Sequence, residues 1–473
     1  MNATTRLSCG LLLGAMLSAC SSTPTQAPAA TQMIEPQRVT EHRGSDDLLT
    51  AGLGLAGLRG MVPPAFADAN QPTSQELRRR AIWNNWRGIA DLSASGGYGE
   101  VYGSTANVPG REYAALATLP GAQQPHRVLV QVPDDFDAGK RCIVVTASSG
   151  SRGIYGSIAV AGAWGLPRGC AVAYTDKGAG SDYVDLDTRT GNREDGTLAP
   201  LAEGGLAFAP ELHDAAGSGV AFKHAHSGGN PEADWGRHVK QAAEFALAAL
   251  DRAFPQAAPF RFDNTRVIAV GVSNGGAAVL RASELDDAGG AGWLDAVVAG
   301  EPNILASAPG ARSAFDFGTE AALLMPCALL HLPADSLPQP PLRTQVEPLW
   351  TARCASLKSA GLVSGDNAKA QAASAYEQLK AGGWTDQALT AGVLSVGFDL
   401  WRAVAVTSAS AYGRYGVGEH PCGYAFSAQN ADFSPRATTA AERAAWWSGG
   451  SGIPPGSGVG IDDTRLAPPD VTL

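Results

Sequence analysis

The residues best suited to chemistry are Gly271-Val272-Ser273-Asn274-Gly275, which fit the pattern G-x-S-x-G. A serine held on a sharp turn between a buried strand and a helix can attack a carbonyl carbon. The β-branched run Arg266–Val270 predicts such a strand, and the small residues of Gly275–Leu285 predict the helix. The pattern therefore predicts Ser273 as a nucleophile. The alternative is an ordinary glycine turn in which Ser273 only caps the helix.

A serine nucleophile needs N–H donors that stabilise the oxyanion formed on the attacked carbonyl. The backbone N–H of Asn274 directly follows the predicted nucleophile and is the first candidate. A second donor is expected from the loop after the third strand of the sheet. The buried run Cys142–Thr146 is followed by a Ser/Gly turn, which makes Ser149 and Gly150 the candidates. An ordinary glycine turn is the alternative there.

A histidine base and an orienting acid are expected after the nucleophile, in the order serine, acid, histidine. Only His331 and His420 follow Ser273, and Asp335 could supply the acid. The order Ser273, Asp335, His420 is therefore available. Both partners lie in a segment predicted to be helical, without two further buried strands to carry them, and they are weak candidates.

His224 and His226 form an H-x-H motif that could begin a metal site. A metal site needs a third ligand at a suitable spacing, and none stands out. We interpret the two histidines as polar loop residues near the mouth of the site. The sequence predicts neither a metal nor a cofactor.

Buried strands alternate with helices from Cys142 to Ala299, which predicts an α/β fold with a mostly parallel sheet. The stretch from Ser181 to Pro231 is Gly-rich and acidic, and it predicts loops over the strand ends. A chain of 473 residues exceeds one compact core. Five segments are predicted: a signal (1–20), a tether and N-terminal extension (21–72), an α/β core (73–307), a helical cap (308–446) and a Gly/Pro-rich tail without a strand (447–473).

Charge and hydropathy exclude two classes of protein. The chain has 45 acidic and 35 basic residues, a net charge of −10, and its longest basic run is Arg78-Arg79-Arg80. A nucleic-acid-binding protein would show a basic stripe. Beyond the N-terminus no apolar run approaches the roughly 18 residues of a membrane span. We expect a small-molecule substrate.

The N-terminus resembles a bacterial lipoprotein signal. Arg6 precedes the apolar run Leu11–Leu17, and Ser18 and Ala19 precede Cys20. The resemblance implies that Cys20 is lipidated, so the membrane is reached only through this anchor; an ordinary secretory signal is the alternative. Either interpretation predicts an exported protein, periplasmic, anchored to the outer membrane or secreted. Five cysteines remain, and this odd number leaves one thiol free or paired outside the chain.

Beyond the elbow motif, the chain resembles the D-(−)-3-hydroxybutyrate oligomer hydrolase family. The similar stretches are Trp83–Gly88, Gln131–Asp134, Tyr174–Gly178, His224–Trp235 and Gly271–Gly275. The resemblance implies an exported, α/β-hydrolase-like serine esterase, with its nucleophile at Ser273 and no cofactor. It implies hydrolysis of dimers and short oligomers of 3-hydroxybutyrate, the soluble products of polyhydroxybutyrate breakdown.

Members of that family are longer at the C-terminus, where their acid and histidine are expected. We therefore expect this chain to be truncated, with the last strands of the sheet missing. Two other functions stay open. One is another exported esterase, tannase-like or feruloyl-esterase-like, and the other is an inactive lipoprotein that only binds.

Overall fold

The computed structural model describes residues 34–463, except 102, 151, 214–216, 287–291, 306, 335–342, 398–399, 433 and 451–457. The described residues belong to one compact unit. The predicted signal with Cys20, and the candidate acid Asp335, lie outside the described residues.

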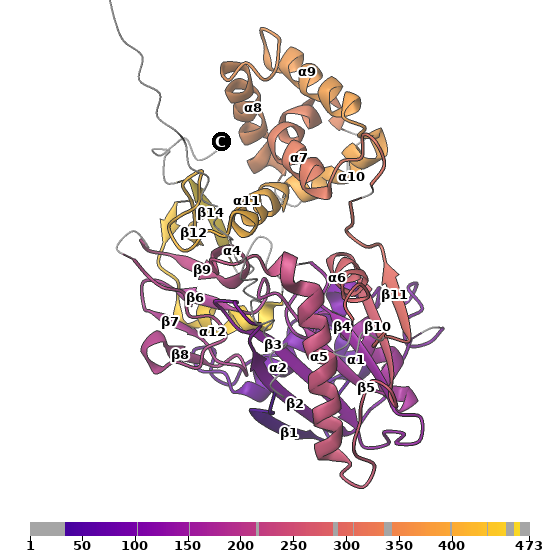
Figure 1. Ribbon diagram of the computed structural model, residues 1–473. Coiled ribbons are helices and arrows are strands. Elements are labelled where there is room, and N and C mark those ends of the chain that lie inside the picture. The colour runs from indigo at the N-terminus through magenta and orange to yellow at the C-terminus, as the bar shows by residue number, and fades with distance from the viewer. Residues whose placement is uncertain are drawn as a thin grey trace, which may run out of the picture. The chain divides into compact units, whose positions relative to one another are not determined.

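A seven-stranded sheet forms the centre of the fold, in the order β1-β2-β3-β5-β4-β10-β11 (Figure 1). Strands β5, β4, β10 and β11 pair in parallel, and the pairs on the β1 side are antiparallel. The α/β class is therefore confirmed, with a mixed sheet. The strands are β1 (Arg38–His42), β2 (Gly110–Ala117), β3 (His126–Pro133), β4 (Cys142–Ala147), β5 (Ala171–Thr175), β10 (Arg266–Val272) and β11 (Ala296–Gly300).

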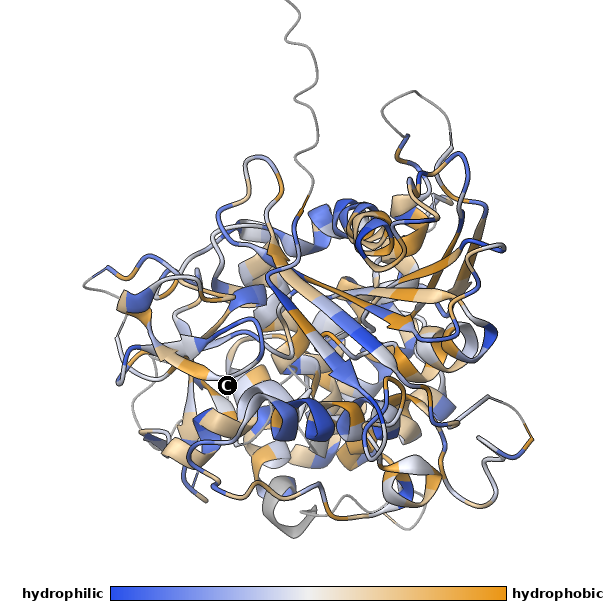
Figure 2. Cartoon of the chain, turned by 90° about the horizontal axis from the view of Figure 1, so that it is seen from below, coloured by the Kyte–Doolittle hydropathy of each residue, from blue (hydrophilic) through white to orange (hydrophobic). Residues whose placement is uncertain are grey.

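Helices cover both faces of this sheet. Helix α5 (Pro231–Ala253) packs its apolar side on one face together with α6 (Asn274–Ala282) (Figure 2). The other face is covered by α2 (Ser74–Ile89) and by the segment between β4 and β5. Because both faces are covered, every residue of β4 is buried, which explains its continuous β-branched sequence.

Several elements on the α2 face are short. Helix α2 begins at the capping box formed by Thr73 and Glu76, and α1 (Gly54–Arg59) precedes it. The connection between β4 and β5 consists of three short helical pieces. The pieces are the π-helix η1 (Ile158–Gly162), α3 (Ala163–Gly165) and the 3-10 helix η2 (Leu166–Arg168).

The prediction of loops from Ser181 to Pro231 is only partly right. This stretch forms a four-stranded antiparallel sheet in the order β8-β7-β6-β9. Each strand has three residues, too few for an alternating pattern to be visible in the sequence. The elements are β6 (Tyr183–Asp185), β7 (Thr190–Asn192), β8 (Leu198–Pro200), η3 (Leu201–Glu203), β9 (Val220–Phe222) and α4 (Lys223–His226).

The segment 308–446 is mainly helical up to residue 413. Its helices enclose a separate hydrophobic core of buried apolar side chains. They are α7 (Ala314–Ala328), η5 (Leu329–His331), α8 (Arg343–Ser359), α9 (Ala368–Ala381), α10 (Asp386–Gly397) and α11 (Leu400–Gly413).

The chain then returns to strands, so the prediction of a tail without a strand is wrong. Strand β12 (Tyr424–Gln429) pairs with β13 (Pro435–Arg436) and with β14 (Val459–Asp463). Helix α12 (Ala440–Gly449) lies against α2 and buries Trp447 in the core on that face. These strands form a sheet of their own, and within the described residues β11 is an edge of the main sheet.

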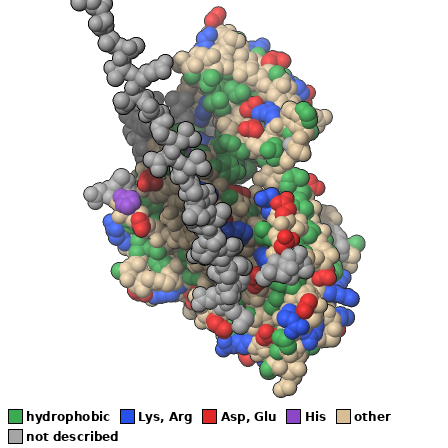
Figure 3. Space-filling model, in the orientation of Figure 1, with side chains coloured by type: hydrophobic (Ala, Val, Ile, Leu, Met, Phe, Trp, Pro, Cys, Tyr) green, Lys and Arg blue, Asp and Glu red, His purple; other side chains and the backbone are tan. Residues whose placement is uncertain are grey.

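Two disulfides join four of the five cysteines beyond the signal. Cys142 pairs with Cys170, Cys327 pairs with Cys354, and Cys422 is a free, exposed thiol. Lys and Arg side chains are interspersed with Asp and Glu on the face shown in Figure 3. No single described helix is long and apolar enough to cross a membrane. The bent pair of α10 and α11 together has the length and the apolar composition of a membrane span.

Candidate active site

Ser273 occupies the single-residue turn between β10 and α6. Its backbone has φ 59° and ψ −126°, a conformation that is strained for a residue with a side chain, and the residue is exposed. The Ser273 N–H donates to the Gly300 oxygen at 2.9 Å, and the Asn303 N–H donates to the Ser273 oxygen at 3.1 Å. These bonds tie the turn to the end of β11 and hold the serine at the edge of the sheet.

The glycines on either side of Ser273 allow the strand and the helix to approach closely. A Cβ at Gly271 would lie 2.2 Å from the Gly275 oxygen, and one at Gly275 would lie 2.5 Å from the Ala147 oxygen. Real Cβ atoms do not tolerate such contacts with backbone atoms. Close backbone contacts therefore explain why both outer positions of G-x-S-x-G are glycine in this structure.

Both groups of predicted oxyanion donors lie at the same edge of the sheet as Ser273. Asn274 is the first residue of α6, where backbone N–H groups have no acceptor within the helix. Ser149 is buried and Gly150 is half-buried in the turn after β4, which is the strand paired with β10. The connection from β4 to β5 crosses one face and α5 crosses the other, so this edge is the switch point where α/β proteins bind ligands.

A buried polar network, missed by the sequence analysis, lies beside the elbow. The Lys177 ammonium donates to Oδ1 of Asn274 at 2.5 Å and forms an ion pair with Glu232. His224 Nε2 lies 3.1 Å from the same Glu232 oxygen. The sequence placed Lys177 and Glu232 in stretches similar to the family, but it offered no spacing that would join them.

Charges within the network favour the ionised form of Glu232, and burial together with the Lys177 charge favours the neutral form of His224. Burial alone would raise the pKa of Glu232, but the Lys177 ammonium and the hydrogen bond with His224 outweigh it, so this pKa is well below its ordinary value. Burial and the Lys177 charge lower the pKa of His224, against the opposing effect of Glu232. Nδ1 of His224 is buried and has no hydrogen-bond partner among the described residues.

The other predicted histidines do not join Ser273. Both nitrogens of buried His420 are used: Nε2 lies 3.1 Å from the Val406 oxygen, and Nδ1 accepts from the Cys422 N–H. His331 is exposed beside Tyr376. His226 is buried, where its Nδ1 contacts the backbone of Phe222.

His224 and His226 lie on the four-residue helix α4, and both side chains are buried, so the prediction that they are loop residues is wrong. Within the part of the chain that the structure describes, no group of three or more His, Cys, Asp or Glu could hold a metal ion.

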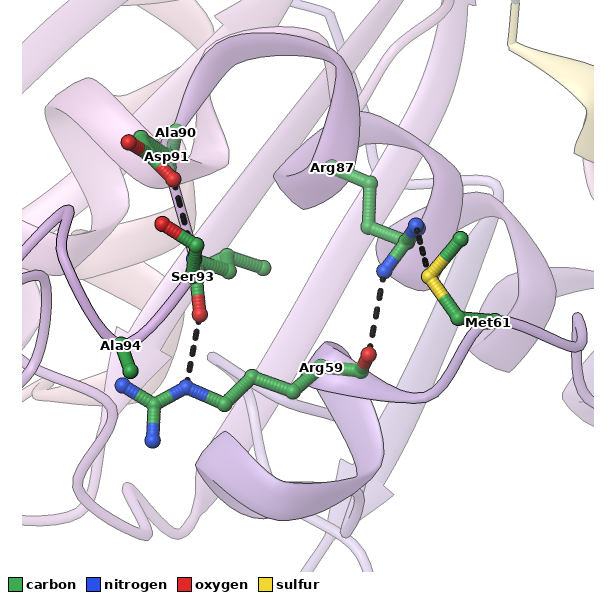
Figure 4. A pocket seen from close by; sticks show the side chains of 8 residues that line it. Arg59, Met61, Arg87, Ala90, Asp91, Ser93 and Ala94 are labelled. Atoms are coloured by element: carbon green, nitrogen blue, oxygen red, sulfur yellow. Dashed lines mark hydrogen bonds between the residues drawn. The ribbon is translucent and has the colours of Figure 1, made fainter.

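A pocket of about 390 Å³ lies away from these residues, at the end of α2 (Figure 4). Its polar contacts are internal: the Arg59 guanidinium donates to the Leu92 oxygen, and Arg87 donates to the Arg59 oxygen. Asp91 accepts from the Ser93 N–H. The lining contains none of the predicted site residues, so the pocket is not the candidate active site.

The fold and the exposed elbow serine together define an α/β protein with the strand–turn–helix geometry on which acyl-transfer enzymes carry a nucleophile. Comparison with known proteins narrows this class. A family model described as 3HB-oligomer hydrolase (3HBOH) matches residues 15–466. The chain belongs to this family of hydrolases.

Individual relatives agree with the family match. A D-(−)-3-hydroxybutyrate oligomer hydrolase of Burkholderia vietnamiensis is 40% identical over 490 residues, which cover 92% of this chain and 70% of the relative. One from Burkholderia thailandensis is 38% identical, with 98% of this chain and 74% of the relative covered. Among solved structures, the rice cell wall degrading esterase LipA from Xanthomonas oryzae is 11% identical with a TM-score of 0.27, over 65% of this chain and 70% of that one.

Proposed function

We propose that this chain is a serine esterase with an α/β-hydrolase-like fold that cleaves dimers and short oligomers of 3-hydroxybutyrate to the monomer. The observation that carries the proposal is the exposed Ser273 on its strained elbow, in a chain of the 3HB-oligomer hydrolase family. The order of the strands, which brings both candidate oxyanion donor groups to one switch point, supports the same class of chemistry.

The proposed reaction is acyl transfer in two steps. Oγ of Ser273 attacks the ester carbonyl, and the N–H of Asn274 and one from Ser149 or Gly150 stabilise the oxyanion. The proton of the Ser273 hydroxyl passes to the departing alkoxide oxygen, so a 3-hydroxybutyrate unit leaves as an alcohol. Water then attacks the acyl-enzyme carbonyl, releases the acid and returns a proton to Oγ of Ser273. Within the described residues no hydrogen bond links Ser273 to a histidine. We therefore assign the nucleophile and the oxyanion donors, and we assign no histidine as the base.

The test is turnover of the 3-hydroxybutyrate dimer by the full chain and by Ser273→Ala. We expect the variant to lose at least about 10³-fold in kcat, as loss of a nucleophile does in serine hydrolases. Mass spectrometry of the intact protein should show a transient acyl group on the wild-type chain only. Equal, near-zero rates in both proteins would favour the inactive, binding-only alternative.

A substrate panel separates the proposal from the other esterase function. Feruloyl and galloyl esters present an aromatic acyl group, whereas the hydroxybutyrate dimer is flexible and aliphatic. We expect a higher kcat/KM for the dimer than for either aryl ester. Preference for an aryl ester would reassign the substrate class while leaving Ser273 as the nucleophile.

We also propose that the protein is exported and anchored through lipidated Cys20. The sequence Leu17–Cys20 supports a lipoprotein signal, and the two disulfides support an oxidising compartment. Metabolic labelling with palmitate and membrane fractionation test this proposal. Cys20→Ser should abolish the label and release the protein from the membrane, whereas an unlabelled wild-type chain would contradict lipidation.

A further inference from the structure

We propose that Lys177 is a positioning residue for the oxyanion donor of Asn274, and that Glu232 and His224 hold Lys177 in place. This inference rests on the proposed function, in which Ser273 is the nucleophile. Lys177 does not act on the substrate itself. It acts through Asn274, whose side chain it holds and whose backbone N–H faces the developing oxyanion.

The first support is the environment of Lys177. It lies two residues after the end of β5, its side chain is only 1% exposed, and its ammonium lies 4.9 Å from the centre of the Trp235 ring. Removing an ammonium group from water is costly unless charged and polar partners replace the water. Glu232 and Asn274 supply these partners.

The second support is the way Glu232 is fixed. It lies in the first turn of α5, where Asn230 Oδ1 accepts from its backbone N–H at 3.1 Å. One carboxylate oxygen contacts both Lys177 and His224 Nε2. The loop after β5, helix α4 and helix α5 each contribute one of these side chains, and Lys177 joins them to the first residue of α6.

The functional consequence follows from the position of Asn274. Oxyanion donors stabilise a transition state most when they need no rearrangement during the reaction. A side chain anchored at 2.5 Å restricts rotation of the Asn274 residue, and the positive end of the ion pair is the end that faces the elbow. Loss of this anchor should slow the chemical step while leaving ground-state binding of the ester nearly unchanged.

The experiment uses the full chain carrying Lys177→Met together with Glu232→Gln. This pair removes both charges, leaves no unpaired buried carboxylate, and keeps an amide oxygen that can accept from His224. For hydrolysis of the 3-hydroxybutyrate dimer we expect kcat to fall about 10- to 100-fold and KM to change less than about threefold. A folded double variant with wild-type kcat would overturn the proposal.

A matched control separates positioning from general loss of stability. Arg78→Met with Glu112→Gln removes another buried ion pair, between α2 and β2, whose side chains are 5% and 0% exposed. Both double variants should lower the thermal unfolding midpoint. Only the Lys177 pair should lower the kcat of the protein that remains folded; equal losses of kcat in the two would contradict the proposal.

A double-mutant cycle tests whether Lys177 acts through Asn274. Asn274→Ala removes the Oδ1 acceptor and keeps the backbone N–H. We expect it to lower kcat to a similar extent as the Lys177 pair, and the combined variant to be no slower than either, because both changes break one interaction. Losses that multiply in the combined variant would contradict the proposed route.

A second readout keeps this inference distinct from the proposed function. A fluorophosphonate probe reports the rate of phosphonylation of Ser273, and the Ser273→Ala variant must not react. A wild-type chain that reacts with the probe, but no faster than the Lys177 pair, would overturn the positioning role alone. A wild-type chain that neither reacts nor turns over the dimer would overturn the nucleophile and, with it, this inference.

Discussion

The strain at Ser273 depends on the absence of side chains at its neighbours. Ser273 is held at φ 59° in the elbow because Gly271 and Gly275, which have no Cβ, allow the strand, the turn and the helix to pack closely together. Such strain persists only where the surrounding structure enforces it. The same glycines place the first turn of α6 beside the loop that carries Ser149.

Gly275→Ala should therefore reduce both stability and activity. The added methyl group would lie 2.5 Å from the Ala147 oxygen and 2.8 Å from the Ser148 oxygen, so the helix must move away from β4. We expect a loss of about 1–3 kcal/mol in the free energy of unfolding, typical of overpacking, and a lower kcat/KM. Urea unfolding and dimer hydrolysis measure the two effects.

Gly292→Ala is the matched control, because a Cβ there has open space within 4 Å. It should leave both quantities close to those of the wild-type protein. If Gly275→Ala were also neutral, close packing would not be the reason for the glycine.

For individual residues, the sequence predicted features that depend only on neighbours in the chain. The five residues Gly271–Gly275, with a strand before them and a helix after them, were enough to predict the elbow. The contacts of Lys177 with Glu232 and Asn274 span 55 and 97 residues of chain, and no periodic pattern encodes them. The contacts of both His420 ring nitrogens likewise depend on the fold of α11 and of the loop after it.

Among the elements, the central parallel strands were predictable and the peripheral strands were not. Strands β4 and β5 are buried on both faces, so their sequences are continuous apolar runs. Strands β10 and β11 also have apolar runs, but β10 is only partly buried and β11 is half-buried to exposed. The three-residue strands β6 to β9 carry no periodic signal. Strands β12 to β14 are short and follow a long helical segment, and β14 lies in a Gly/Pro-rich stretch, so the sequence around them favoured helix or loop.

The Cys142–Cys170 disulfide links the first residue of β4 to the residue before β5, which are neighbouring strands. It closes a loop of 28 residues. Replacing both cysteines with serine should reduce the free energy of unfolding by about 3–4 kcal/mol, chiefly because the unfolded chain regains conformational freedom. Urea unfolding under non-reducing conditions measures the change.

Cys422→Ser is the control for this substitution, since Cys422 is a free and exposed thiol. It should leave the unfolding curve unchanged. A shift of equal size in both variants would show that the disulfide is not the source of the stabilisation.

For the molecule as a whole, a stacked pair of buried histidines makes stability depend on pH. His126 begins β3 and His238 lies on α5, with ring centres 3.9 Å apart, so the pair joins the main sheet to its covering helix. Burial, together with the charges of Lys223 and Arg237, lowers the pKa of His238 to about 3. Burial, His238 and Lys223 lower the pKa of His126 well below its ordinary value.

These shifts set the direction of the pH effect. An unfolded histidine takes up a proton near pH 6.5, whereas the folded pair resists protonation. The unfolded state therefore binds more protons below that pH, and stability is complete above about pH 6.5 and falls as the pH decreases toward 3. Each histidine contributes a slope of up to about 1.4 kcal/mol per pH unit.

Urea unfolding between pH 7.5 and 5 tests this expectation on the wild-type chain and on the His126→Gln, His238→Gln double variant. The variant should be less sensitive to acid, because glutamine does not titrate, although its stability at pH 7.5 should be lower where the ring stacking is lost. Carboxylates titrate equally in both proteins, so the difference between the two slopes isolates the histidine pair. His213→Gln, at an exposed position, should reproduce the wild-type slope. Parallel curves for the wild-type chain and the double variant would show that the buried pair does not control acid stability.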